Sequence, residues 1–155
     1  KVGKPSWIWL QIHGYAYFYY REPWAAEEEC MTYISLIHGA RGIKFFAQKP
    51  RSAELWNELR VLSREIRELT PILYSTETIP EIKLTSKGID YTVKTYNGKS
   101  YIIAVNMYST NIKASFKVPN DKISVNVLFE NRSLKLKKNT LSDTFGPYQR
   151  HVYEL

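Results

Sequence analysis

The sequence predicts an α/β segment followed by an all-β segment, and two observations lead to this fold class. In residues 1–76, two stretches carry apolar side chains at every third or fourth position, and each adjoins a short run of strand-forming residues. From residue 77 on, apolar and polar residues alternate, so the period changes from 3.6 to 2. The chain of 155 residues is long enough for two small domains, which we place at 1–76 and 77–155.

The first predicted strand lies within residues 5–14, PSWIWLQIHG. This run is almost continuously apolar, which is typical of strands buried on both faces of a parallel sheet. Its polar residues, Gln11 and His13, come at its C-terminal end. Residues 15–24, YAYFYYREPW, follow as a loop that is dense in aromatic side chains.

Residues 27–46, EEECMTYISLIHGARGIKFF, predict a helix, a tight turn and a short buried strand. The helix has an apolar stripe with i, i+3, i+4, i+7 spacing, formed by Cys30, Tyr33, Ile34 and Ile37. Three glutamates open it, where the positive end of the helix dipole favours them. Gly39 is expected to be the left-handed stop residue. The one cysteine of the chain lies on the stripe, so we expect it to act as a small buried hydrophobe.

A second strand, Gly42–Ala47, is closed by Gln48, Lys49 and Pro50, and a long helix follows from about Ser52 to Leu69. Ser52 is the expected N-cap, and Thr70-Pro71 is expected to end the helix because a residue before proline avoids the helical region. The order strand, helix, strand, helix predicts two parallel strands with a right-handed crossover. Two parallel strands do not form a stable layer alone, so their partner strands are expected to lie outside this chain.

The second half predicts an antiparallel β-sandwich. Short strands with turns every eight to twelve residues are typical of that architecture, and Asn97-Gly98 is a hairpin signal. The expected strands are residues 89–96, 101–106, 113–118, 125–129, 134–136 and 151–155.

Composition restricts the classes of partner. The net charge of +7 lies mainly beyond residue 80, but the lysines are scattered singly, so a solvated outer sheet face is favoured over a surface for nucleic acid or anionic polysaccharide. No apolar run is long enough for a membrane span, and no signal peptide is visible. No metal-ligand spacing or cofactor motif is present, so none is expected. Asn131 begins an N-glycosylation pattern, which has meaning only in a secreted chain, and an extracellular location is favoured.

Candidate binding residues follow from the strand ends, because ligands of parallel α/β sheets sit at the carboxyl ends of the strands. Gln11, His13 and Gln48 stand there. Amides and neutral imidazoles both donate and accept hydrogen bonds, which suits hydroxyl-rich ligands. Trp24 and the neighbouring tyrosines are candidates for a wall that stacks against a sugar ring. The alternatives are a structural histidine at His13 and an aromatic lid or core.

These segments resemble a known family. The run PSWIWLQIHG, the aromatic loop, EEECMTYISLIHGARGIKFF and LWNELRVLSREIRELTPIL are similar to the seventh and eighth β/α units of TIM-barrel glycoside hydrolases, in particular β-galactosidase-like glycosidases. The ending FGPYQRHVYEL is similar to the closing strand of the all-β domain that follows such barrels. The resemblance implies a partial (β/α)8 barrel, its last two β/α units, with a C-terminal antiparallel β-sandwich.

The resemblance also implies hydrolysis of glycosidic bonds by paired carboxylates. In the family the acid lies on the fourth strand, which this chain lacks, and the nucleophile ends the seventh, where Gln11 stands. An amide cannot act as nucleophile, so no catalytic residue is assigned and the chain alone is expected to be inactive. Only substrate contact carries over, for Gln11, His13 and Gln48.

Two functions are compatible with this reading. The first is the C-terminal portion of a glycoside hydrolase-like protein, with carbohydrate and the remainder of the barrel as partners. The second is a non-catalytic module, derived from such a hydrolase, that binds glycan or protein through the aromatic loop. Open strand edges and one uncovered sheet face would also favour association with a second copy of the chain.

Overall fold

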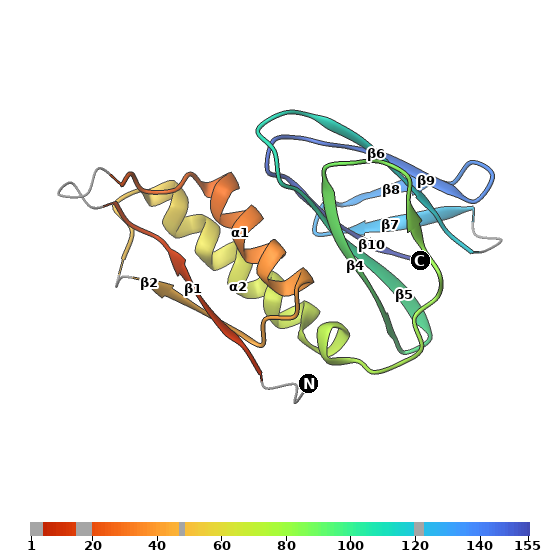
Figure 1. Ribbon diagram of the computed structural model, residues 1–155, viewed down its shortest axis with the longest axis horizontal. Helices are drawn as coiled ribbons and strands as arrows, with labels where there is room; N and C mark the ends of the chain where they lie inside the picture. Colours follow the sequence, from red (N-terminus) through yellow and green to blue (C-terminus); the bar gives the residue numbers. More distant parts are fainter. Residues whose placement is uncertain (1–4, 15–19, 47–48, 120–122) are drawn as a thin grey trace.

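The computed structural model describes residues 5–14, 20–46, 49–119 and 123–155. Its N-terminal part, here called the α/β layer, contains β1 (Trp7–Gln11), α1 (Ala25–Ile37), β2 (Gly42–Phe46) and α2 (Ala53–Tyr74). The two strands pair in parallel, with Trp7 opposite Gly42 and Gln11 opposite Phe46, as the strand–helix alternation predicts. Figure 1 shows both helices lying between this strand pair and the all-β part of the chain.

Helix α1 begins at Ala25, two residues before the expected start, because the Glu27 carboxylate caps it from inside. The backbone N–H of Trp24, the N-cap residue, donates to Glu27 Oε2 at 2.9 Å. At the other end Gly39 has a φ of 85°, the left-handed stop that the sequence predicts. Cys30 is a free, buried thiol, also as predicted.

Helix α2 starts as predicted but ends later. The Ser52 hydroxyl accepts a hydrogen bond from the Leu55 backbone N–H at 3.1 Å, so Ser52 is the N-cap. The expected stop at Thr70-Pro71 is wrong, because the helix continues through Pro71 to Tyr74. A proline this close to the end removes one backbone hydrogen bond, and the burial of Ile72 in the core keeps the last turn helical.

The all-β part contains two antiparallel sheets. The five-stranded sheet has the order β4 (Ile89–Tyr96), β5 (Lys99–Asn106), β10 (Arg150–Glu154), β7 (Ser124–Leu128), β8 (Arg132–Lys135), and the three-stranded sheet the order β3 (Lys83–Leu84), β6 (Ile112–Lys117), β9 (Thr140–Phe145). Asn97 and Gly98 both have positive φ and form the predicted hairpin turn. The sequence did not predict β3 or β9, because β3 is two residues long and β9 is mostly polar on its exposed face.

The five-stranded sheet is covered on both faces. One set of β5 side chains, including Ile102 and Ala104, packs into a core with the three-stranded sheet. The alternate set, including Ile103 and Val105, packs against the helices, where Tyr33 is fully buried. This two-sided burial explains why β5 reads as a continuous apolar run.

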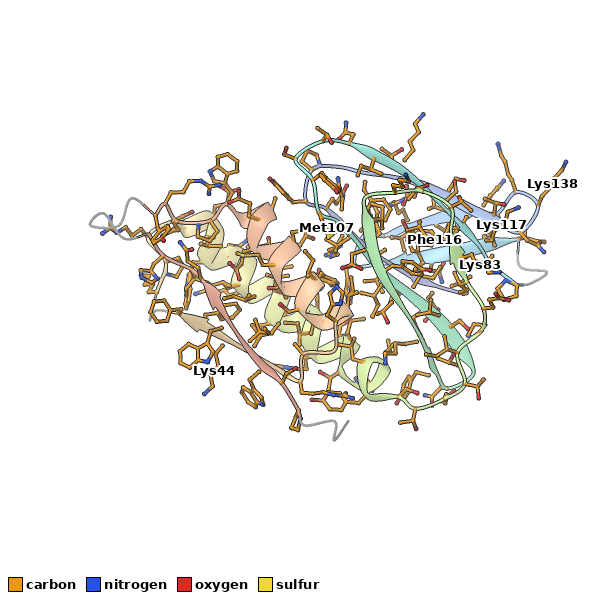
Figure 2. All side chains as sticks on the ribbon, in the orientation of Figure 1. Lys44, Lys83, Met107, Phe116, Lys117 and Lys138 are labelled. Atoms are coloured by element: carbon orange, nitrogen blue, oxygen red, sulfur yellow. The ribbon has the colours of Figure 1, made fainter. Side chains whose placement is uncertain are left out.

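The face of β1 and β2 that points away from the helices is open. Trp7 and Trp9 are 58% and 62% exposed there, and Phe46 is 47% exposed. Lys44 extends from this face, with Nζ 5.4 Å from the Trp7 ring centroid and 5.3 Å from that of Trp9. Figure 2 shows Lys44 on the side of the strands opposite the helices. Gly42 is required beneath Trp7, because an added Cβ would lie 2.5 Å from the indole ring.

Candidate functional site

Gln11, at the carboxyl end of β1, holds the connection between β1 and α1. Its side-chain nitrogen donates to the backbone carbonyls of His13, at 2.7 Å, and Arg21, at 2.8 Å. Both amide hydrogens therefore serve the local backbone, and the side-chain oxygen is the group that can accept from a ligand hydroxyl. Substrate contact by Gln11 stays a prediction, restricted to acceptance of a hydrogen bond.

His13 joins the ends of the two parallel strands. Its Nδ1 lies 2.7 Å from the Phe46 carbonyl oxygen. A carbonyl only accepts hydrogen bonds, so Nδ1 must carry the proton in this contact. Its half-buried ring also lies against the Phe46 ring, with centroids 5.4 Å apart. Gln48, the third candidate at the strand ends, lies outside the described residues, as do the tyrosines between residues 15 and 19.

Trp24 lies next to Arg21, a residue for which no role was predicted from the sequence. The indole is 65% exposed, and the Arg21 guanidinium carbon lies 4.4 Å from its ring centroid. Arg21 also makes a two-pronged ion pair with Glu27, which lowers the pKa of that carboxyl chiefly through the hydrogen bonds from the guanidinium. One side of the predicted stacking wall is therefore occupied by an arginine.

A cavity of about 460 Å³ lies beside these groups, where the α/β layer meets the all-β part. Its lining comes from the end of β1, the following connection, α1 and a turn before β10, and consists of Gln11, Tyr20, Arg21, Pro23, Glu27, Cys30, Met31 and Tyr148. Trp24 and His13 are not part of this lining. Burial raises the pKa of the Cys30 thiol to about 11, so it is not a nucleophile at neutral pH.

A turn of the all-β part carries Tyr148 with a φ of 59°, a left-handed conformation that is rare for a bulky side chain. Its backbone N–H donates to the Tyr108 carbonyl at 3.0 Å. The Asn106 amide donates to the Gly146 carbonyl at 2.7 Å, and the Gly146 N–H donates to the Gln149 side chain at 2.7 Å. These bonds over-determine the turn and hold Tyr148 at the cavity.

A buried ionic cluster, here called the Arg150 cluster, joins the two parts of the molecule. Arg150 of β10 pairs with Glu65 of α2, with Glu29 of α1 at 3.1 Å and with Glu130 of the β7–β8 turn at 3.4 Å. Burial opposes the charge of Arg150, but the surrounding acidic groups raise its pKa overall. Tyr33 donates to Glu65 at 2.7 Å and completes the helix side.

The Arg150 cluster continues into the sheet. The Glu130 carboxylate accepts hydrogen bonds from His151 Nδ1 at 2.5 Å and from Arg132 at 2.7 Å. Arg132 also forms an ion pair with Asp143 at 2.7 Å. Burial works against the charge of Glu130, but its hydrogen bonds from His151 and Arg132 lower its pKa. The cluster holds its side chains to one another. Among the described residues, no group of three or more His, Cys, Asp or Glu side chains could hold a metal ion.

Of the three glutamates at the start of α1, Glu28 is buried and Glu29 is half-buried beside Arg150, so dipole matching alone does not account for them. Glu28 is fully buried, and neither carboxylate oxygen has a hydrogen-bond partner among the described residues. Burial raises its pKa to about 8. Burial also raises the pKa of Glu29, to about 7, although Arg150 acts in the opposite direction.

No carboxylate pair faces the described ends of β1 and β2. The nearest acid on the connection, Glu22, accepts from the backbone N–H groups of Arg51 and Ser52, at 2.7 and 2.8 Å, and so binds the start of α2. The described strand ends therefore present no acid–base pair, and the binding of hydroxyl groups there stays a prediction. Asn131 lies exposed in the β7–β8 turn, and its glycosylation stays a prediction. Neither described helix is long and apolar enough to cross a membrane.

Comparison with known proteins gives matches in fold. No family model matches the chain, and no curated protein matches its sequence. The α-amylase of Geobacillus thermoleovorans, solved with acarbose, matches with a TM-score of 0.68 and 12% identity over 96% of this chain and 38% of its own. A family 30 endoxylanase from Clostridium papyrosolvens matches with a TM-score of 0.57 and 13% identity over 98% and 42%. A maltogenic α-amylase from Thermotoga neapolitana matches with a TM-score of 0.59 and 9% identity, over 100% of this chain and 42% of its own.

In fold the chain therefore resembles a portion of a TIM-barrel glycoside hydrolase, as the resemblance drawn from the sequence implies, and the narrower likeness to β-galactosidase-like glycosidases stays a prediction. It spans about two fifths of the length of these enzymes. At such low identities the likeness is one of fold.

Proposed function

We propose that this chain is the C-terminal portion of a glycoside hydrolase-like protein. In this proposal β1 with α1 and β2 with α2 are the last two units of a (β/α)8 barrel, residues 1–76. Residues 77–155 are the β-sandwich that follows. The chain contributes Gln11, His13 and Gln48 to one stretch of the carbohydrate site, and the acid and nucleophile come from the other units.

One observation carries the proposal. The parallel pair is covered by helices on one face only, and among the described residues each strand pairs solely with the other. Its uncovered face has a mixture of large aromatic rings and one lysine, which a complete barrel would enclose. The matched enzymes are more than twice as long as the chain, which supports the view that further β/α units belong beside it.

The test is to determine whether the gene encodes further β/α units upstream of Lys1, and to assay the longer product against the 155-residue chain on α- and β-linked glycosides. We expect hydrolysis by the longer product only. Gln11→Ala in that product should lower kcat/KM at least tenfold, because it removes one substrate hydrogen bond and also the two bonds that hold the β1–α1 connection. An upstream sequence without β/α units would refute the proposal.

The alternative function is a non-catalytic module that binds glycan or protein. The exposure of Trp24, with Arg21 stacked on it, favours this alternative. It predicts that the 155-residue chain binds its partner with full affinity alone and that Trp24→Ala abolishes binding. Under the barrel proposal Trp24→Ala has a small effect, because the strand ends carry the contact.

A further inference from the structure

We infer that the cavity between the α/β layer and the all-β part is a subsite for a neutral sugar ring, with Tyr148 as its stacking residue. The inference rests on the proposed function and extends it, because it assigns a binding role to the all-β part. Of the residues predicted from the strand ends that the structure describes, Gln11 lines this cavity and His13 does not.

The size and walls of the cavity suit a small polyhydroxylated ligand. Its volume of about 460 Å³ lies within the range of small-molecule sites. Tyr20 and Tyr148 supply aromatic surface, on which the C–H face of a sugar ring packs. The Gln11 side-chain oxygen can accept from a ligand hydroxyl, and the paired Arg21 and Glu27 side chains add polar edges to the wall. Met31 gives an apolar wall, so the lining is amphipathic in the way that a sugar is.

The charge of the lining favours a neutral sugar over a charged ligand. The two ionised side chains in it, Arg21 and Glu27, are paired with each other through both guanidinium nitrogens. Neither an anion nor a cation therefore gains a net electrostatic attraction there. The Cys30 thiol donates to the Asn106 carbonyl at 3.5 Å, so it is turned to the backbone.

Tyr148 has the feature that distinguishes a built site from a gap between packed parts. A tyrosine with left-handed backbone is strained, and glycine or asparagine would fill a simple turn at less cost. The hydrogen bonds from Asn106 to Gly146 and from Tyr148 to Tyr108 keep it in that conformation. The strain places an aromatic ring beside Arg21 and Gln11, where it can contact a ligand.

The test uses the 155-residue chain labelled with ¹⁵N and titrated with maltotriose, xylotriose and melibiose. We expect at least one of them to shift the backbone amides of Arg21, Met31 and Tyr148 in a saturable manner. Shifts confined to residues outside the cavity, or no shift with any of the three, overturn the inference.

Variants separate a ligand contact from a structural role. Tyr148→Phe keeps the ring and should bind within twofold of the wild type, whereas Tyr148→Asn keeps the left-handed backbone but should bind at least tenfold more weakly. Lys138→Asn is the matched control, because Lys138 has a φ of 48° and lies at the far end of the all-β part (Figure 2). It should bind as the wild type does. If Tyr148→Asn does not fold, the amide shifts of the wild-type chain alone decide whether the cavity binds the sugar.

The outcome also distinguishes this inference from the proposed function. Saturable shifts at Gln11 and His13 that persist in Tyr148→Asn overturn the subsite and leave the strand-end site intact. Loss of binding in Tyr148→Asn, together with hydrolysis by the longer gene product, supports both. A longer product without β/α units, combined with sugar binding that depends on Tyr148, refutes the barrel proposal and leaves the cavity as a binding site of a non-catalytic module.

Discussion

Replacement of Arg150 by methionine should destabilise the fold by roughly 3–5 kcal/mol, the cost of removing one partner from a buried ion pair. Arg150 is only 8% exposed, and its loss leaves the Glu65 and Glu29 carboxylates without their cation, whereas Glu130 keeps Arg132. Methionine has a similar length, so the cavity contribution is small and the electrostatic one dominates. Because the three acids come from α1, α2 and the β7–β8 turn, the junction between the two parts should weaken first.

The measurement is the free energy of unfolding from urea titrations at pH 7.5, for the wild type, Arg150→Met, Glu65→Met and the double variant. The double variant should be more stable than the sum of the two single losses predicts, by about 1–3 kcal/mol. The reason is that it removes both charges of the Arg150–Glu65 pair, whereas each single variant leaves one charge buried without that partner. Arg132→Met is the control, because that side chain is 31% exposed and should cost less. A loss below about 1 kcal/mol for Arg150→Met, with additive energies, would refute the reasoning.

Three further predictions follow from single residues. The folded pKa of Glu28, about 8, exceeds the ordinary value of 4.5, so the free energy of unfolding should fall as pH rises from 4.5 to 8. At about 1.4 kcal/mol per pKa unit, Glu28→Gln should restore a few kcal/mol of stability at pH 9 and little at pH 5, as measured by urea titration. Trp9→Ser removes a ring that is 62% exposed and should reduce self-association in light scattering; a wild-type chain that is already monomeric and monodisperse contradicts this. Ser52→Ala should cost about 1 kcal/mol in thermal unfolding, because Leu55 N–H loses its cap.

Local chemistry made much of the fold predictable. Gly39, Ser52 and the Asn97-Gly98 pair each have a conformational or capping preference that neighbours do not override, and all act as the sequence predicts. The parallel direction of β1 and β2 follows from the helix between them. Pro71 does not act as the predicted helix stop, because burial of Ile72, a tertiary effect, outweighs the local preference against helix.

The candidate site was predictable only where one strand end defines it. Gln11 could be selected because polar residues at the carboxyl end of an apolar run are informative. Tyr148 could not, because it is 137 positions further along the chain and reaches the same cavity only through the packing of the two parts. The burial of Glu28 and the half-buried position of Glu29 could not be predicted, since dipole matching and burial beside Arg150 produce the same sequence pattern. A positive φ at a tyrosine has no signature in the sequence.

The source of stability and the open surface lie on opposite sides of the helices. Tyr33, Leu62 and Leu69 are buried against the five-stranded sheet, and Arg150 adds ionic contacts to both helices from that side. Helices α1 and α2 are therefore anchored to the all-β part by both apolar and ionic contacts. Trp7 and Trp9 remain exposed in a chain that is otherwise well packed. A partner that covers this apolar surface best explains why it is kept. In the barrel proposal that partner is the further β/α units.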